Sequence, residues 1–303
     1  MSSLSTANTS DEQGLSKIGV GLRHPHYKEA LLRTSSIDFV EIHAENFFAE
    51  GGMLPELLND IALQYPISLH STSMGLGSAV GINGDYLQRL KQLSQQINPI
   101  LISDHACFTW SNINGNSVHA GDLLPLEFTQ QSLQVMVDNV NQVQQLLGRQ
   151  ILVENLSAYV EFNFSDMSET EFLSELVDKT GCGLLVDLNN LLVNARNFSD
   201  QKPLTVARKW LREIPSSAVG EIHLAGFTKV KEGELVIDDH SQPVSPECWL
   251  LYRDAVALFG AVTTLIEWDN NLPTWSTLLD QASKARSIST EVHYDTGRLS
   301  YAV

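Results

Sequence analysis

Residues 219–240 read VGEIHLAGFTKVKEGELVIDDH, and this stretch indicates how the rest of the chain is organised. Its apolar start, Val219–Leu224, predicts a strand with His223 near the C-terminal end. We expect a hairpin to follow, with Glu232-Gly233 at its tip, and then the sequence Asp238-x-His240. In an extended backbone, residues i and i+2 project to one side, so this last pair has the spacing of two ligands of one metal ion.

The same pattern, a short apolar run that ends in polar residues, recurs along the chain from Lys17 onward. Amphipathic segments lie between the runs and predict helices at 54–64, 85–96, 127–147, 170–179, 203–214, 246–259 and 274–286. Strands that alternate with helices imply a parallel sheet, and their number matches an α/β fold of the (β/α)8 TIM-barrel type. A doubly wound open sheet is the alternative, but no Gly-x-Gly-x-x-Gly follows the first strand. The predicted strands are 18–22, 39–43, 67–70, 100–103, 151–154, 184–187, 219–224 and 264–267.

The chain has 303 residues, which suits one barrel domain over residues 17–287. The polar segment 1–16 predicts a disordered tail, and the polar segment 288–303 predicts a loosely packed C-terminal tail. Two connections are unusually long: 106–125, with Asn114-Gly115 as a hairpin turn, and 226–239. Long loops at the C-terminal face of a barrel are where substrates are covered.

The charge of the chain excludes some classes of partner. The formal net charge is −17, whereas binding to nucleic acid or to an anionic membrane surface needs a basic face. No apolar run reaches the length of a transmembrane helix, and the N-terminal residues lack the apolar core of a signal peptide. We therefore expect a soluble, cytoplasmic protein whose three cysteines form neither a disulfide framework nor a zinc finger.

Polar side chains fall at the C-terminal ends of the predicted strands. Any one of them has an ordinary explanation, such as a helix N-cap or a hydrogen-bonded core histidine. In a closed barrel, however, all strand ends surround one axis, and buried carboxylates and imidazoles must be protonated, paired or bound to cations. Metal binding is the simplest way to satisfy such a set. Its members are Glu41, His43, Glu45, Asn46, His70, Asp104, His105, Glu154, Asn155, Asp187, Asn189, Asn190, His223, Asp238, His240, Glu267 and Asp269.

The residue types restrict the metal. The set contains no thiolate, which excludes zinc–thiolate and iron–sulfur sites, whereas imidazole and carboxylate suit iron, manganese or zinc. The number of ligands exceeds the need of one ion and suggests two or three. Glu154, placed centrally among the strands, would naturally bridge two of them.

The motifs on successive strands resemble those of the multinuclear non-heme iron-dependent oxidative enzymes, the family that includes the enzyme of methanobactin biosynthesis. The resemblance extends from about Lys17 to Arg286 and implies a xylose-isomerase-like TIM barrel. The motifs that carry it are GVGLR (19–23), FVEIHAENFF (39–48), SDH (103–105), LVENLSAY (152–159), LLVDLNN (184–190), EIHLAGF (221–227) and IEWDNNLP (266–273).

The resemblance also implies a ligand set, carried over at matching positions. The third site should bind more weakly, because the amide oxygen of Asn190 is neutral. The sequence departs from the His-Asp-Thr-His pattern of the family, and the additional Asp239 could compete as a ligand. The implied ligands are His70, His105 and Glu154 for the first iron, Glu154, Asp187, His223 and Glu267 for the second, and Asn190, Asp238 and His240 for the third.

The function implied by the resemblance is the oxidation of a cysteine in a ribosomally made peptide by two or three iron ions that activate dioxygen. A separate small protein often presents the substrate in this family. We expect Glu154, His70 and His105 to carry the chemistry, because that ion has room for a thiolate and dioxygen. The cysteines of the chain itself are expected to be structural.

Three other readings remain open. A metal-dependent phosphoesterase or a sugar isomerase would use the same fold and the same ligand types, with zinc or manganese in place of iron. A sugar isomerase usually has a lysine near its metals, and no lysine lies at a predicted strand end. A protein that only stores metal is the third alternative.

Overall fold

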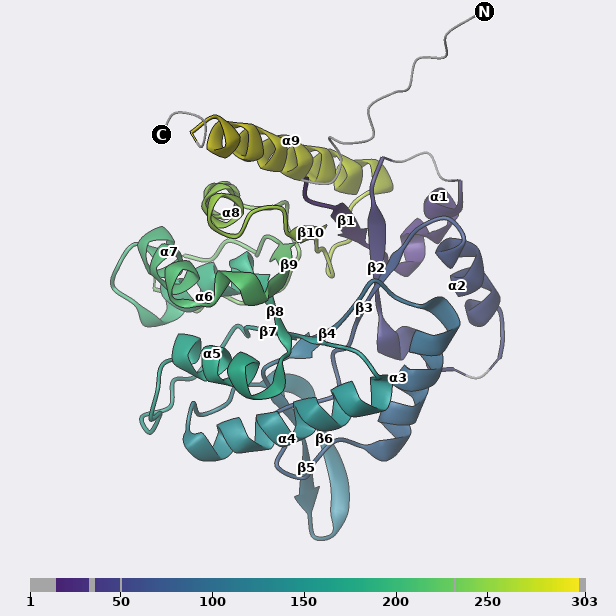
Figure 1. Ribbon diagram of the computed structural model, residues 1–303, viewed down its shortest axis with the longest axis vertical. Helices are drawn as coiled ribbons and strands as arrows, with labels where there is room; N and C mark the ends of the chain where they lie inside the picture. The colour runs from purple at the N-terminus through teal and green to yellow at the C-terminus, as the bar shows by residue number, and fades with distance from the viewer. Residues whose placement is uncertain (1–14, 33–35, 50, 232, 300–303) are drawn as a thin grey trace, which may run out of the picture.

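The computed structural model describes residues 15–32, 36–49, 51–231 and 233–299 (Figure 1). Within them, eight parallel strands close a barrel in the order β1-β10-β9-β8-β7-β4-β3-β2. The predicted TIM-barrel fold is therefore confirmed. The strands are β1 (Ile18–Gly21), β2 (Phe39–His43), β3 (Ile67–His70), β4 (Leu101–His105), β7 (Leu152–Glu154), β8 (Gly183–Asp187), β9 (Val219–Leu224) and β10 (Thr263–Ile266).

The strands are apolar because helices cover the outside of the barrel and side chains fill its inside. The ring closes where Ile18 of β1 pairs with Thr264 of β10. On the other side of β1, close approach to β2 needs a glycine. A Cβ at Gly19 would lie 2.5 Å from the ring of Phe39, so a larger residue would push β1 away from β2.

The helices surround the barrel (Figure 1). Several begin at an N-cap side chain that accepts a backbone N–H, such as Asn83 before α3 and Ser168 before α5. We did not predict two helices, α1 and α6. The helices are α1 (Tyr27–Leu31), α2 (Leu54–Ala62), α3 (Gly84–Ile97), α4 (Gln130–Leu147), α5 (Glu169–Thr180), α6 (Leu188–Phe198), α7 (Pro203–Glu213), α8 (Pro246–Phe259) and α9 (Trp275–Leu299).

The two ends of the chain differ from the sequence-based expectation. We expected a loosely packed tail from residue 288, but α9 continues through it to Leu299, with Ser289 and Val292 buried. Residues 1–14 of the expected N-terminal tail lie outside the described residues, and Ser16 is buried against Ser289, with 2.8 Å between the hydroxyl oxygens. No helix in the described ranges has the length and apolarity needed to cross a bilayer.

The two long loops gave one confirmed and one wrong prediction. Strands β5 (Phe108–Ile113) and β6 (Asn116–Leu124) form the hairpin expected at Asn114-Gly115, where both residues have the positive φ of a type I′ turn. The hairpin projects away from the barrel (Figure 1).

The hairpin expected after β9 does not form among the described residues of 225–240, none of which lies in a strand. Glu232, at the expected tip, lies outside the described residues. Instead, backbone N–H groups of Ser241 and Gln242 donate to Gly226 O at 3.1 and 3.4 Å, so the segment leaves and returns at one point as an Ω-loop does.

Candidate metal centre

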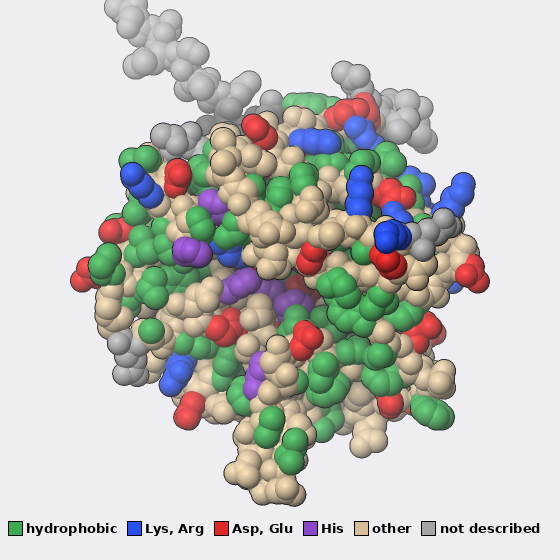
Figure 2. All heavy atoms as spheres, turned by 180° about the vertical axis from the view of Figure 1, so that it is seen from behind, with side chains coloured by type: hydrophobic (Ala, Val, Ile, Leu, Met, Phe, Trp, Pro, Cys, Tyr) green, Lys and Arg blue, Asp and Glu red, His purple; other side chains and the backbone are tan. Residues whose placement is uncertain are grey.

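The predicted ligands project from the C-terminal ends of the barrel strands. His70, His105, Glu154 and Asp187 are the last residues of β3, β4, β7 and β8, and Glu267 directly follows β10. Parallel strands end at one rim, which is why residues so far apart in sequence meet here. Figure 2 shows a hollow near the middle of the opposite face to that of Figure 1, with histidine side chains on its wall.

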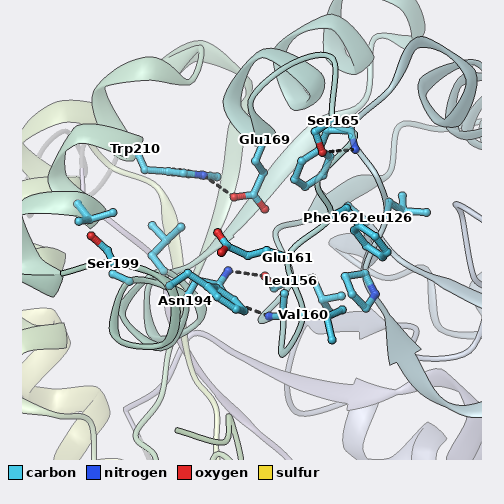
Figure 3. Close-up of a pocket in the computed structure, with 18 of the residues that line it drawn as sticks. Leu126, Leu156, Val160, Glu161, Phe162, Ser165, Glu169, Asn194, Ser199 and Trp210 are labelled. Atoms are coloured by element: carbon cyan, nitrogen blue, oxygen red, sulfur yellow. Dashed lines mark hydrogen bonds between the residues drawn. The ribbon is translucent and has the colours of Figure 1, made fainter. Parts of the chain in front are cut away.

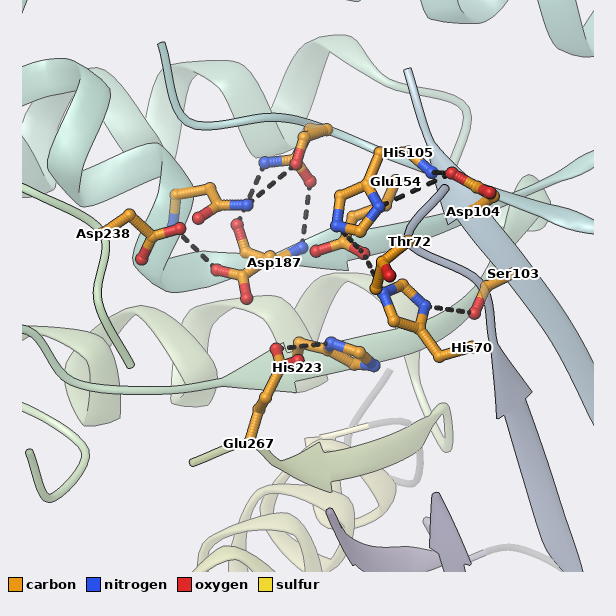
Figure 4. A network of polar contacts seen from close by, with 12 residues as sticks. His70, Thr72, Ser103, Asp104, His105, Glu154, Asp187, His223, Asp238 and Glu267 are labelled. Atoms are coloured by element: carbon orange, nitrogen blue, oxygen red, sulfur yellow. Dashed lines mark hydrogen bonds and ion pairs between the residues drawn. The ribbon is translucent and has the colours of Figure 1, made fainter. Parts of the chain in front are cut away.

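The first group consists of His70, His105 and Glu154, all buried (Figure 4). Glu154 Oε2 lies 3.6 Å from His70 Nε2 and 3.3 Å from His105 Nε2. The other ring nitrogens face supporting side chains. Ser103 Oγ is 2.8 Å from His70 Nδ1, and Asp104 Oδ1 is 3.6 Å from His105 Nδ1. The contact with Ser103 is a hydrogen bond, of the kind that orients a metal-binding imidazole from behind, whereas His105 Nδ1 forms no hydrogen bond among the described residues.

The second group shares Glu154 with the first and adds Asp187, His223 and Glu267, with one ligand atom from each lying within 4.8 Å of the others. His223 Nδ1 lies 3.0 Å from Glu267 Oε2, and its Nε2 lies 3.3 Å from Glu41 Oε2. Glu154 therefore stands between two clusters of donor atoms, as expected for a bridging carboxylate.

The structure brings Asp238 and His240 together, with 2.8 Å between Oδ1 and Nε2. We expected an extended backbone to align them. Instead, His240 has a φ of 42°, in the left-handed region, so a turn at His240 makes the contact. His240 also reaches Glu267, at 3.2 Å between Nδ1 and Oε2, and Asp187, at 3.8 Å between Nε2 and Oδ2. The third site thus adjoins the second.

The amides beside this pair have different partners. Asn190, expected as a ligand, donates from Nδ2 to Asn155 O at 3.0 Å, while its buried Oδ1 has no hydrogen-bond partner among the described residues. Asn189 donates from Nδ2 to Asp238 Oδ1 at 2.7 Å and so positions that carboxylate. An oxygen of Asn190 is thus free for a ligand role.

Asp239, the possible competing ligand, and Glu45, a member of the predicted set, both have other partners. Asp239 accepts hydrogen bonds from the backbone N–H and the hydroxyl of Thr228, so the expected competition by Asp239 for a metal finds no support in this geometry. Glu45 accepts from Thr72 N at 2.8 Å and from Tyr86 Oη at 2.5 Å.

Sequence reasoning missed two charged residues of the site. Glu221 is fully buried, two positions before His223 on β9, so the alternation of strand side chains could have placed it on the same inner face. Arg23 was noted only within a family motif, yet its buried guanidinium donates to Asp269 Oδ1 at 2.9 Å from Nε and 2.5 Å from Nη2. No pattern near Arg23 indicates this contact.

The electrostatics favour a cation in this pocket. Burial raises the pKa of Glu154 to about 8, against the lowering effect of His105, and burial raises that of Asp187 to about 7. Burial opposes ionisation of Glu267 too, but His240 and His223 hold its pKa well below the usual range. Carboxylates that resist ionisation in the protein alone would ionise readily beside a metal ion.

The donor atoms fit metal ions of the kind that imidazole and carboxylate bind. Two ligands at about 2.1 Å from one ion, in tetrahedral or octahedral geometry, lie roughly 3.0–3.4 Å apart. The His–carboxylate separations of 3.3 and 3.0 Å given above agree with this spacing. In addition, Glu154 Oε2, Asp187 Oδ2 and His240 Nε2 are buried without a hydrogen bond in the described part of the chain.

Comparison with solved structures shows the fold. A xylose isomerase domain containing protein from Salmonella typhimurium LT2 superposes with a TM-score of 0.61 at 13% identity, covering 91% of this chain and 97% of that one. A D-psicose 3-epimerase from Clostridium cellulolyticum H10 gives a TM-score of 0.57 at 12% identity, covering 91% and 99%. Identities this low show a xylose-isomerase-like TIM barrel and nothing about the reaction.

Comparison with other sequences shows the family. A UPF0276 protein of Vibrio vulnificus YJ016 is 43% identical over 273 residues, which make up 89% of this chain and 91% of the relative. One from Rhizorhabdus wittichii RW1 is 41% identical over 276 residues, 90% of this chain and 95% of the relative. The family described as "RiPP precursor modification enzyme MbnB/TglH/ChrH", in which RiPP denotes a ribosomally made, modified peptide, matches residues 17–290. The chain belongs to this family of peptide-modifying enzymes.

Proposed function

We propose that this protein is a multinuclear non-heme iron-dependent oxidase that uses dioxygen to modify a cysteine in a ribosomally made peptide. Membership in a family of peptide-modifying enzymes supports the peptide substrate. The observation that carries the metal part of the proposal is the pair of buried donor groups that share Glu154. Two such groups, free of thiolate, suit iron ions that must leave room for a substrate sulfur.

We assign the ligands as the resemblance implies, with two to three ions in all. When bound, iron would supply a binding position for the peptide thiolate and would activate dioxygen. The ligands of the first ion would be His70, His105 and Glu154, those of the second Glu154, Asp187, His223 and Glu267, and those of the third Asn190, Asp238 and His240.

The residues behind the ligands would prepare the site. The hydroxyl of Ser103 contacts the outer ring nitrogen of His70 and so would fix which nitrogen of that ring points to the centre. The carboxylate of Asp104 lies near the outer nitrogen of His105 and would attract a proton there. The cysteine that follows β4, Cys107, is not suited to act as a nucleophile. Cys107 is fully buried, and burial raises the pKa of its thiol well above the usual range. The reactive sulfur would therefore come from the substrate.

A small partner protein that presents the peptide belongs to the same proposal and is supported by the resemblance alone. Its presence can be tested separately from the chemistry, by measuring whether turnover of a peptide by the purified chain is complete without any added protein.

Substitution of the shared carboxylate tests the metal assignment. Glu154→Gln removes a negative charge from both donor groups, and losses of this kind lower metal affinity by at least about tenfold. We expect purified wild-type protein to contain at least two irons per chain and the variant to lose both, with an unchanged circular dichroism spectrum. Glu175→Gln on the exposed side of α5 is the matched control. A Glu154→Gln protein with full metal content would refute the bridging role.

A thiol-dependent oxygen measurement tests the reaction. A cysteine-containing peptide should change the iron absorption spectrum, and oxygen consumption should require both the peptide and ferrous iron. His70→Ala should abolish both effects. Hydrolysis of a phosphodiester without oxygen, at an enzyme-like rate and with no response to thiols, would instead support a hydrolase. Full occupancy by zinc after growth in iron-rich medium would also remove the oxidative proposal.

A further inference from the structure

A second cavity lies beside the candidate metal centre, outside the barrel. Its volume is about 380 Å³, and it opens between helices α5, α6 and α7 and the segment that follows β7 (Figure 3). Most of its wall is apolar, including Leu156, Val160, Phe162, Leu191, Phe198 and Val206.

The cavity is lined in part by residues that adjoin predicted metal ligands in the sequence. Ala106 directly follows His105, Leu156 lies two residues after Glu154, and Leu191 directly follows Asn190, and all three line the cavity. A short peptide with its cysteine at the centre can therefore place a neighbouring side chain here, because extended chain spans about 3.3 Å per residue.

Two carboxylates make one side of this apolar cavity acidic. Glu169, at the start of α5, is half-buried and accepts a hydrogen bond from Trp210 Nε1 at 2.7 Å. Burial raises the pKa of Glu169 to about 7, against the lowering effect of that hydrogen bond. Glu161, on the segment after β7, also lines the cavity (Figure 3). Neither carboxylate forms an ion pair with a lysine or arginine of the described residues.

We infer that this cavity, given the peptide-modifying function proposed above, binds a lysine or arginine side chain of the substrate peptide near the reactive cysteine. The aliphatic stem would lie along Leu191 and Phe198, and the cationic head would meet Glu169 and Glu161. Lysine and arginine bind in this manner because their stems are apolar and only their heads carry charge. The indole of Trp210, held by Glu169, adds an aromatic surface beside the cation.

Other occupants fit the cavity less well. An apolar side chain would remove more water from Glu169 without adding a charge to offset its own, and this opposes the burial of that carboxylate. An acidic side chain would be repelled by both carboxylates, and the whole chain carries a net charge of −17. A basic side chain is the one occupant that satisfies the apolar walls and the acidic side together.

Peptide binding to the metal-free protein tests the inference. The probes are acetylated, amidated heptapeptides of alanine and glycine with one cysteine and, at each other position in turn, lysine, norleucine or glutamate. Isothermal titration calorimetry measures each dissociation constant. Because a charge-assisted hydrogen bond adds roughly tenfold in affinity or more, at one position lysine should bind at least about tenfold more tightly than norleucine.

The variants decide whether the cavity is responsible. Glu169→Gln keeps an oxygen for Trp210 but removes the charge, so the preference for lysine should fall to about twofold or less. Glu161→Gln changes an exposed side chain, which leaves folding unaffected, and should reduce the preference to a smaller extent. Glu175→Gln, farther along α5, should retain it. Equal binding of lysine and norleucine peptides at every position, or a preference that survives Glu169→Gln, would overturn the inference.

The outcome is separable from that of the proposed function, because no metal and no turnover enter the binding measurement. A lysine preference in a protein without iron chemistry would contradict only the proposed oxidase. Iron-dependent oxidation of a peptide cysteine without any lysine preference would contradict only the basic subsite.

Discussion

His223 shows how single residues of this barrel support one another. Its imidazole is fully buried and lies between Glu267 on one side and Glu41 on the other. Glu41 also accepts a hydrogen bond from the hydroxyl of Ser68, at 3.3 Å. A carboxylate behind a histidine fixes the orientation of the ring and raises the basicity of the nitrogen that faces the metal.

The first prediction concerns this supporting carboxylate. Glu41→Gln leaves a hydrogen-bond acceptor for His223 but no charge, so we expect iron affinity to fall by roughly 10- to 100-fold with the fold retained. Competition with a coloured chelator under anaerobic conditions measures the change. The control is Glu175→Gln. Glu175 lies on α5, pairs with Lys179 at 3.5 Å and belongs to none of the buried donor groups of the described residues, so its variant should stay within about twofold of wild type.

The second prediction is a pH dependence that arises from Glu169. Its folded pKa of about 7 exceeds the ordinary value of 4.5, so the folded state binds the proton more tightly than the unfolded state does. The resulting stabilisation is complete below pH 4.5 and is lost as the pH rises through 7. The measurement is the free energy of unfolding in urea for wild type and Glu169→Gln, at pH 5 and at pH 8. Between these two pH values the difference between the proteins should change by at most about 3 kcal/mol, and by less in proportion to the solvent exposure of the side chain. A pH-independent difference would contradict this assignment.

At the scale of elements, the sequence was sufficient wherever the burial pattern is regular. Strand 219–224 is predicted to the residue because it begins and ends with an apolar residue, Val219 and Leu224, and almost all of it is buried. Helix α4 is recognisable from its long amphipathic period. Helix α6 escaped prediction because it begins directly after β8, so that Asn189 and Asn190 in its first turn were assigned to the end of the strand. In the structure the side chain of Asp187 accepts from Asn190 N and caps the helix.

The grouping of the strand-end side chains was predictable because the strands are regular. The prediction was less accurate in the loops. His70, His105, Glu154 and Asp187 meet because the strands that carry them are regular, so barrel closure determines their position. Contacts that depend on loops were not predictable. Asp238 and His240 meet through a positive φ, and Asp239 is drawn away by Thr228, which no periodic pattern records.

The third prediction concerns the last helix, α9, whose C-terminal half continues beyond the expected boundary. Val292 there is 5% exposed, and truncation to alanine removes buried methyl groups worth about 1.5–2.5 kcal/mol with the cavity included. We expect Val292→Ala to lower the unfolding free energy in urea by that amount. Tyr294→Ala, two residues on and 57% exposed, should change it by less than about 0.5 kcal/mol. Equal effects of the two substitutions would place the end of the packed helix before residue 292.

For the whole molecule, the buried acidic residues of the barrel mean that a metal ion bound as proposed would also stabilise the fold. Glu41, Glu154, Asp187 and Glu267 are buried around one axis, and Arg23 is the buried guanidinium that faces them in the described part of the chain. A cation that binds only the folded state adds its binding free energy to stability.

The fourth prediction follows from this linkage. Ferrous iron at about one hundred times its dissociation constant should stabilise the fold by roughly 2.7 kcal/mol per ion. For a chain of this size that corresponds to a rise in melting temperature of about 5–10 °C, which anaerobic calorimetry can measure. The increment should shrink in Glu154→Gln and remain in Glu175→Gln. An unchanged melting temperature with iron bound would mean that the unfolded chain binds it equally well.

The seam between β1 and β10 also has a consequence for how the chain is made. Ile18 leaves the ribosome early, but its partner Thr264 follows only after nearly the whole domain has been synthesised. At usual rates of synthesis, roughly 10 to 50 s separate the two. Through that interval the apolar strand 18–21 has one unpaired edge, a surface on which newly made chains aggregate. The nascent protein is therefore most vulnerable before its last strand appears, and the finished ring removes that edge.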